Sequence, residues 1–113
     1  MASAFAQEAV YVHETANLNG IDIARATGVA DSTARAWLAG TRSPSRTRAA
    51  ERLVELSAIV ERLVRVMDPD YIAVWLRKPI RALDDRKPLD VIRDGDFREV
   101  SKLVAAMESP TAA

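Results

Sequence analysis

Apolar residues recur at helical spacing along most of this chain. Between Ser45 and Met67 no glycine or proline interrupts the sequence, and apolar positions follow one another at intervals of three and four residues. Because a helix completes a turn every 3.6 residues, this pattern predicts one long helix of about six turns with a single apolar seam. The seam consists of Leu53, Leu56, Val60, Leu63 and Met67.

Proline and acidic residues mark the starts of shorter helices farther along the chain. Asp68 and Pro69 supply an N-cap and a first-turn proline for one helix. Pro88 opens a second, short helix, and Asp96 and Glu99 have the spacing of a capping box for a last one. Few glycines and few aromatic residues argue against a β-sandwich or barrel. The sequence therefore predicts an all-α fold, a small helical bundle.

Residues 20–39 have the pattern of two short helices that cross at a tight turn. Ala24 is small where the helices must approach each other, and Gly28 stands at the turn, where a left-handed backbone is cheapest for glycine. Ile23, Val29 and Trp37 are the expected apolar contacts. The order of elements resembles the Xre/Cro-type helix-turn-helix, which implies an N-terminal DNA-binding region.

With those residues facing inward, the outer face of the second helix carries short polar groups and one arginine. Such side chains suit the major groove of DNA. The formal net charge of the chain is zero, but no acidic residue lies between Asp31 and Glu51, which leaves a local basic stripe. A helical hairpin with merely solvated arginines is the alternative, favoured by a carboxylate at the groove end. The expected DNA-contacting residues are Asp31, Ser32, Thr33, Arg35, Arg42, Arg46 and Arg48.

Downstream of the long helix a second motif has a distinctive order of residues: tryptophan-leucine, proline, alanine-leucine, proline-leucine-aspartate, an apolar pair and a glycine. It is formed by Trp75-Leu76, Pro79, Ala82-Leu83, Pro88-Leu89-Asp90, Val91-Ile92 and Gly95. Together with residues 20–39, this frame resembles the MbcA/ParS/Xre-type antitoxin family over roughly residues 17 to 104. The chain differs from the family at one turn, where Asp84-Asp85-Arg86 stands in place of the usual glycine.

The resemblance implies a type II antitoxin that binds and neutralises a RES-domain toxin, an enzyme that consumes NAD, and that represses its own operon. It also implies three regions: a DNA-binding region at 1–48, a dimerisation and toxin-binding domain at 49–107, and a tail at 108–113. Two alternatives stay open. One is a stand-alone helix-turn-helix repressor without a toxin partner, and the other is a helical adaptor that binds only protein.

The resemblance further implies which residues meet partners, although a core position is the simpler explanation for each apolar residue of the frame taken alone. For the long-helix seam, an interface in a homodimer and the core of one chain are both open. The tail is expected to block the toxin's active site, the alternative being an end without consequence. The expected toxin contacts are Trp75, Arg77, Lys78, Arg81, Ser109, Pro110, Thr111, Ala112 and Ala113.

Composition limits the other functions that this chain could have. It has 113 residues, of which 49% are apolar and 28% charged, and no cysteine. His13 is the only histidine, so neither a zinc cluster nor a catalytic triad is recognisable. The aspartates between residues 84 and 96 lack the order of a calcium-binding loop. We therefore expect no enzyme activity, no metal, no cofactor and no small-molecule substrate. The start of the chain has neither a leader nor a membrane-spanning pattern, which indicates a cytoplasmic protein.

Overall fold

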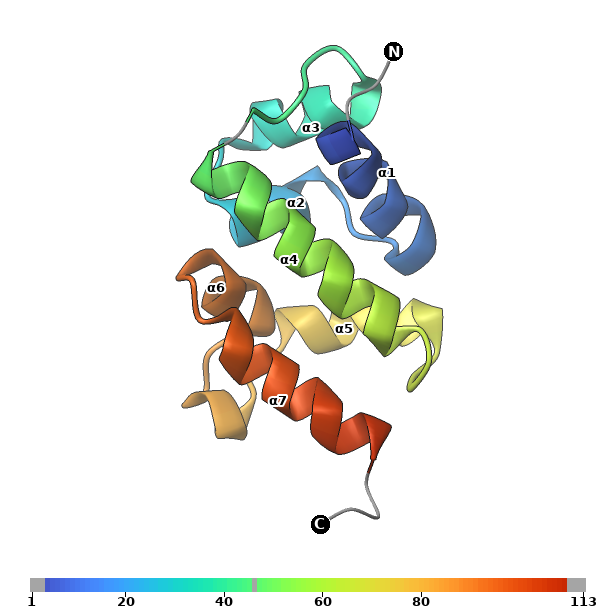
Figure 1. The fold of residues 1–113 in the computed structure, drawn as a ribbon, viewed down its shortest axis with the longest axis vertical. Coiled ribbons are helices and arrows are strands. Elements are labelled where there is room, and N and C mark those ends of the chain that lie inside the picture. The colour runs from blue at the N-terminus through green and yellow to red at the C-terminus, as the bar shows by residue number, and fades with distance from the viewer. Residues whose placement is uncertain (1–3, 46, 110–113) are drawn as a thin grey trace.

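A computed structural model describes residues 4–45 and 47–109, and in this part of the chain the secondary structure consists of helices joined by loops, with no strand. It contains seven α-helices and one short 3₁₀ helix (Figure 1). The predicted all-α class is confirmed. The elements are α1 (Ala4–Ala16), α2 (Gly20–Thr27), α3 (Asp31–Ala39), α4 (Arg48–Leu63), α5 (Pro69–Arg77), η1 (Arg81–Leu83), α6 (Pro88–Arg93) and α7 (Phe97–Glu108).

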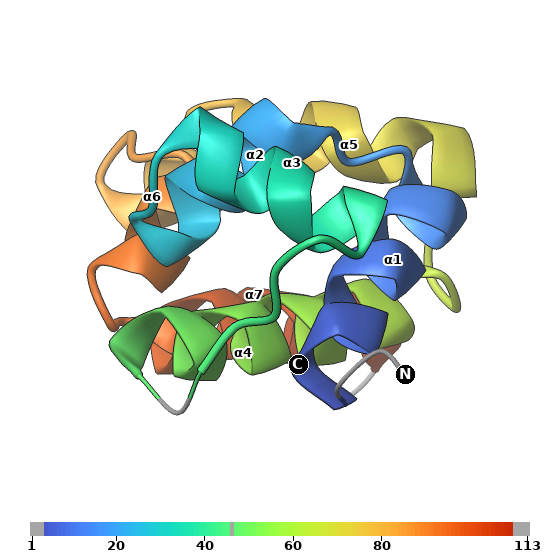
Figure 2. The ribbon, with the colours of Figure 1, turned by 90° about the horizontal axis from the view of Figure 1, so that it is seen from above.

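The long helix α4 is the central element of an elongated molecule of 45 × 24 × 21 Å. It contacts α1, α2, α5, α6 and α7. Figure 2 shows α4 and α7 along one side of the molecule, and α2 and α5 along the opposite side. One continuous cluster of buried apolar side chains runs from Ala9 in α1 to Val104 in α7, so both halves of the chain share a core. No helix of the described residues is long and apolar enough to cross a membrane.

The apolar seam of α4 lies inside this core. Leu53, Leu56, Val60 and Leu63 each have 0% of their surface exposed, and Met67 packs against the cluster from its edge. The sequence leaves open whether a second subunit covers the seam, because it does not show how many helices of one chain reach α4. Five helices of the same chain contact α4, and the four buried side chains have no surface left for another subunit. The seam is the core of one chain.

Local capping sets the ends of several helices. α4 begins later and ends earlier than the periodicity predicts, because Thr47 accepts a hydrogen bond from the amide of Ala50 and the backbone leaves the helix after Leu63. The predicted cap of α5 is confirmed: the Asp68 carboxylate accepts from the amide of Asp70, with Pro69 in the first turn.

The predicted capping box of α7 is wrong. The side chain of Asp96 accepts no hydrogen bond from its own helix and instead lies 3.3 Å from Nη1 of Arg86. Arg86 also lies 3.6 Å from Asp94, so a guanidinium between two carboxylates competes successfully with the backbone amides. Asp96 and Glu99 have the spacing of a capping box, but Asp96 forms an ion pair with Arg86 instead of capping α7.

The turn that lacks the family's glycine is built by two aspartates. Asp84 and Asp85 have φ angles of 57° and 62°, in the left-handed region that short polar side chains tolerate better than most. The amide of Asp85 donates to the carbonyl of Ile80, and Ile80 also pairs with Arg86 in an isolated antiparallel bridge. These bonds close the turn and aim α6 back toward α2.

Candidate functional site

The outer face of α3 exposes the side chains that the sequence predicts to contact DNA. α3 packs against α2, and the two helices are joined through Gly28 at a φ of 81°. Asp31, Ser32 and Arg35 are exposed and Thr33 is half-buried. The opposite face holds Trp37, which is 4% exposed and belongs to the core cluster. The predicted division of α3 into an inner and an outer face is confirmed, while contact with DNA stays a prediction.

Arg35 is held by its packing on the first residue of α2. A Cβ atom added to Gly20 would come within 2.8 Å of Cγ of Arg35, much closer than any unstrained contact. Because Gly20 has no side chain, the aliphatic part of the Arg35 side chain can pack against it. Arg35 nevertheless remains exposed to solvent. Sequence reasoning missed this role, because Gly20 stands at a helix start where glycine needs no special explanation.

The remaining arginines of the basic stripe follow α3. Arg42 is exposed and its Nη1 lies 3.5 Å from the hydroxyl of Thr33, so it is next to the outer face of α3. Arg48, the first residue of α4, is also exposed. Arg46 lies outside the described residues. Within the described residues, Arg35, Arg42 and Arg48 have no ion-pair partner. Their charges are thus free for a ligand. Figure 1 shows α3, which carries Arg35, near one end of the long axis.

The residues expected to meet a toxin lie at and after the end of α5, and they differ in exposure. Trp75 is 9% exposed and belongs to the core, which favours a packing role for this residue over a contact with a partner. Arg77, Lys78 and Arg81 are exposed. The ammonium of Lys78 lies 3.2 Å from the hydroxyl of Tyr71 and 5.9 Å from the centre of its ring, close enough for a cation–π contact.

Arg77 also ties α5 to α2. Its Nε and Nη2 donate to the two oxygens of Asp22, at 2.8 and 2.6 Å. The same carboxylate accepts from the backbone amide of Asn19, whose side chain in turn accepts from the amide of Asp22. This reciprocal capping box starts α2. The Asn19-x-x-Asp22 spacing is a sequence signal for this box that the predicted helix starts did not include.

A second charged pair joins α2 to α6. Arg25 donates to the two oxygens of Asp90 at 2.5 and 3.0 Å. The hydrogen bond from Arg25 is the main cause that lowers the pKa of the Asp90 carboxyl, with further help from the charges of Arg25, Arg93 and Lys87 and against the effect of burial. Asp90 is therefore ionised at neutral pH, and α2 is bound to the C-terminal half by two bidentate ion pairs.

The end of α7 is fixed in a similar way. Nη2 of Arg62 in α4 lies 2.5 Å from the carboxylate of Glu108, and Nη1 donates to the hydroxyl of Ser101 at 2.7 Å. The hydrogen bond from Arg62 holds the pKa of Glu108 below its ordinary value. These bonds define where the chain leaves α7. Ser109 is exposed, and Pro110, Thr111, Ala112 and Ala113 lie outside the described residues.

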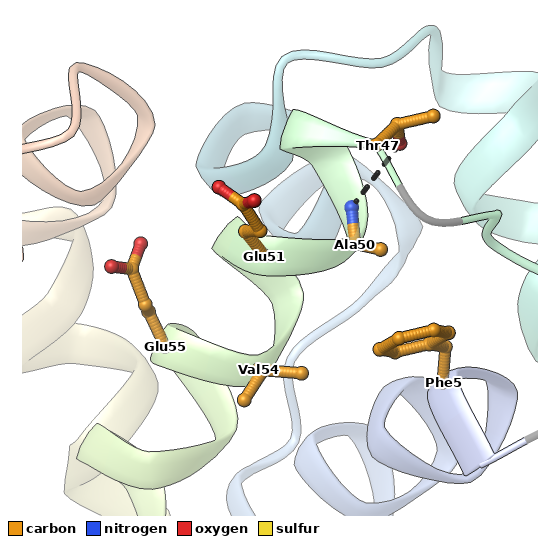
Figure 3. Close-up of a pocket in the computed structure, with 6 residues that line it drawn as sticks. All are labelled: Phe5, Thr47, Ala50, Glu51, Val54 and Glu55. Carbon is orange, nitrogen blue, oxygen red and sulfur yellow. Dashed lines mark hydrogen bonds between the residues drawn. The ribbon is translucent and has the colours of Figure 1, made fainter.

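A hollow of about 510 Å³ opens between α1 and α4. Figure 3 shows the ring of Phe5 on one side of it and Thr47, Ala50, Glu51, Val54 and Glu55 of the α4 region on the other. Its lining offers two carboxylates but no histidine, cysteine or lysine that would complete a catalytic set. No group of three or more metal-ligating side chains occurs in the described part of the chain. The hollow is thus a surface feature without recognisable chemistry.

Comparison with known families assigns the C-terminal half. Residues 56–109 match the family described as the antitoxin Xre/MbcA/ParS C-terminal toxin-binding domain. The C-terminal half of this chain is a domain of the Xre/MbcA/ParS antitoxin family. This match confirms the family predicted from the frame at residues 75–95.

Other members of the Xre/MbcA/ParS family resemble this chain over longer stretches. The mycobacterial cidal antitoxins MbcA of Mycobacterium bovis and of Mycobacterium tuberculosis are 39% identical to it over 71 residues. That alignment spans 63% of this chain and 62% of those antitoxins. A probable mycobacterial cidal antitoxin of M. tuberculosis is 29% identical over 80 residues, which span 71% of this chain and 67% of that protein.

The fold itself is similar to a solved structure. A chain in the crystal structure of the M. tuberculosis MbcT-MbcA toxin-antitoxin complex superposes with a TM-score of 0.79 at 29% identity, over 94% of this chain and 95% of that one. The family frame is mostly packing in this fold, because Leu76, Leu83, Leu89 and Ile92 are all buried. The residues by which the family is recognised therefore build the interior of the domain.

Proposed function

We propose that this chain is the antitoxin of a toxin–antitoxin pair and neutralises a RES-domain, NAD-consuming toxin by direct binding. The observation that carries the proposal is the likeness over 94% of the chain to a structure from the MbcT-MbcA toxin-antitoxin complex, supported by the match of residues 56–109 to a toxin-binding domain. The chemistry belongs to the toxin. Our chain supplies a rigid surface, built on α5, α6 and α7, that covers it.

Co-purification with the toxin tests this function. A tagged toxin, encoded beside this chain, is co-expressed with the untagged antitoxin, and the complex is isolated and assayed for NAD consumption. We expect a stable complex that leaves NAD intact, and release of activity when the complex is dissociated. A toxin that emerges alone and active from the same preparation would contradict the proposal.

The chain end is the part that we propose to enter the toxin's active site. Arg62 and Glu108 fix the end of α7, and Ser109 to Ala113 follow it with small side chains and one proline. A narrow peptide of this kind fits a cleft shaped for NAD and phosphate groups. In this proposal, α5 to α7 supply the affinity and the tail supplies the block.

DNA binding is a second function, favoured by the unpaired arginines around α3. We propose that α3 reads the major groove through Ser32, Thr33 and Arg35, with Asp31 at the groove end, and that Arg42, Arg46 and Arg48 contact phosphates. A chain that binds both its promoter and its toxin can repress its own operon. Because a groove reader usually pairs two half-sites, we also propose a homodimer, formed by exposed residues rather than by the buried seam of α4.

Gel shifts with promoter DNA test this second function. Arg35→Ala should reduce the preference among sequences, whereas Arg42→Ala should weaken binding to all sequences and lower the slope of affinity against salt by about 1. Arg65→Ala is the matched control, because Arg65 is 67% exposed and lies just after the C-terminal end of α4, far along the chain from α3. Wild-type affinity and preference in both α3-region variants would exclude this face. Sedimentation of the wild-type chain measures the dimer directly.

A further inference from the structure

Of the four exposed large apolar side chains in the described residues, two lie on α5 and a third lies on α2 beside the ion pair that joins α2 to α5. Ile21 is 62% exposed, Val74 48% and Tyr71 42%. Val74 precedes Arg77 by one turn of α5, and Ile21 directly precedes Asp22, the partner of Arg77. Ile21 and Arg77 also line the same surface hollow of about 260 Å³. Large apolar residues on a surface are common singly, but a cluster of them marks a binding site.

Basic side chains surround this apolar cluster. Arg25, Arg77 and Lys87 line the hollow beside Ile21, and Lys78 lies over the ring of Tyr71. The carboxylates of Asp22 and Asp90 are already bound by Arg77 and Arg25. Neither Lys78 nor Lys87 has an ion-pair partner among the described residues. We call these six residues the α5 patch: Ile21, Tyr71, Val74, Arg77, Lys78 and Lys87.

The charge of the α5 patch selects among its possible occupants. A second copy of this chain, related by a two-fold axis, would place the patch against itself and bring lysine and arginine against lysine and arginine. DNA would leave Ile21, Tyr71 and Val74 against phosphates, since interfaces with DNA are more polar than this cluster. The carboxylate of Asp70, at the start of α5, accepts a hydrogen bond from Asn17. The α5 patch is therefore complementary to an acidic protein surface that has apolar side chains at its centre.

We propose that the α5 patch is the docking surface for an acidic, partly apolar face of the toxin. Five of its six residues lie within the matched toxin-binding domain at 56–109, which makes the patch continuous with the part of the chain assigned to that partner. Ile21 lies outside the domain, on α2. The inference rests on the proposed antitoxin function and adds to it that α2, part of the DNA-binding region, contributes to the toxin interface.

Variants that introduce a glutamate, each with a matched control, test the patch. Val74→Glu is compared with Val54→Glu, which changes a similarly exposed valine on α4, and Lys78→Glu with Arg65→Glu just after α4, where the arginine is 67% exposed. Affinity for the purified toxin is measured by biolayer interferometry at two salt concentrations. Far-UV circular dichroism checks that each variant is folded, and Lys78→Glu decides the question if Val74→Glu fails to fold.

We expect the two patch variants to weaken toxin binding by about tenfold or more, as central interface residues do, and the two controls to bind within about twofold of wild type. Ile21→Glu should weaken binding as well. Wild-type affinity in both patch variants, while the unmodified chain binds the toxin, would overturn the patch and leave the antitoxin function standing. An unmodified chain that does not bind the toxin would overturn both. If the patch variants lost affinity for DNA but kept their affinity for the toxin, the patch would be assigned to DNA binding. If Ile21→Glu bound the toxin as wild type does, α2 would not be part of the toxin interface.

Discussion

The carboxylate of Asp22 on α2 binds the guanidinium of Arg77 on α5 across 55 positions of sequence, and it caps its own helix at the same time. Its side chain is 7% exposed, whereas that of Arg77 is 44% exposed. The pair therefore has one buried and one solvated end. A buried carboxylate needs its hydrogen-bond donors far more than a solvated guanidinium needs its acceptor. Asp22 is thus the more sensitive member of the pair.

A double-mutant cycle measures the coupling. In Asp22→Asn, Arg77→Gln and the double variant, urea unfolding should give an interaction free energy of about 1–3 kcal/mol between the two residues. The double variant should be more stable than the two single losses together imply, because neither partner is left charged against a neutral one. Additive losses in the free energy of unfolding would mean that the two side chains act independently.

The ion pair between Arg25 and Asp90 gives the stability a dependence on acid pH. Because Arg25 lowers the pKa of Asp90 below its ordinary value of 3.8, the pair's contribution is complete above that value and is lost as the pH falls through the folded pKa. At pH 7, Asp90→Asn should lower the free energy of unfolding by about 1 kcal/mol, a figure reduced for the solvent exposure of Arg25. The difference from wild type should disappear in strong acid. Glu51→Gln, an exposed control, should show no such trend, and a difference that persists in acid would point to packing instead.

Gly20→Ala should weaken DNA binding, although Gly20 is not itself a proposed DNA contact. The added methyl group would meet Cγ of Arg35 at 2.8 Å and displace the arginine stem. We expect the variant to keep its helical circular dichroism but to shift toward the sequence preference of Arg35→Ala in gel shifts. Wild-type affinity and preference in the Gly20→Ala variant would show that Arg35 reaches the same contact from a displaced stem.

Two apolar residues two positions apart on α4 should respond differently to truncation. Leu56 is completely buried, so Leu56→Ala should lower the free energy of unfolding by about 2–5 kcal/mol. Val54 is 41% exposed, and Val54→Ala should stay within about 0.5 kcal/mol of wild type. Chemical denaturation measures both. If Leu56→Ala had little effect on the free energy of unfolding but changed the sedimentation coefficient, the seam would be an interface between subunits.

Removal of Ser109 to Ala113 should separate binding from inhibition. The ion pair of Arg62 with Glu108 and all of α7 precede the deletion, so we expect the truncated chain to fold and to bind the toxin. The toxin in that complex should consume NAD, while the full-length complex should not. Complete inhibition by the truncated chain would show that the body of the antitoxin, rather than its tail, closes the active site.

Features that depend on neighbours in sequence were predictable. The start of α5 follows from Asp68 and Pro69 alone, because capping is a property of one turn of chain. The inner and outer faces of α3 follow from periodicity in the same way. The family followed from the frame at residues 75–95, since closely spaced prolines and apolar residues determine one small fold.

Features that depend on distant partners were not predictable. Asp96 had the spacing of a cap, but Arg86 binds it instead. The seam of α4 could be assigned to the core only when the helices that cover it were placed, and the same holds for the approach of Gly20 to Arg35. Sequence shows which side chains are able to form a contact, but the packing of α2 against α5 and α6 decides which of them meet.

The matched toxin-binding domain begins at residue 56, in the middle of α4, while the buried cluster runs without a break from α1 to α7. A recombination event at that boundary would join half of one helix to half of another and set unmatched side chains against Leu53 and Val60. Antitoxin genes that exchange C-terminal halves would therefore produce poorly packed hybrids unless the whole of α4 and the residues that contact it travelled together. The shared core therefore favours inheritance of the N-terminal and C-terminal halves of this chain as one unit.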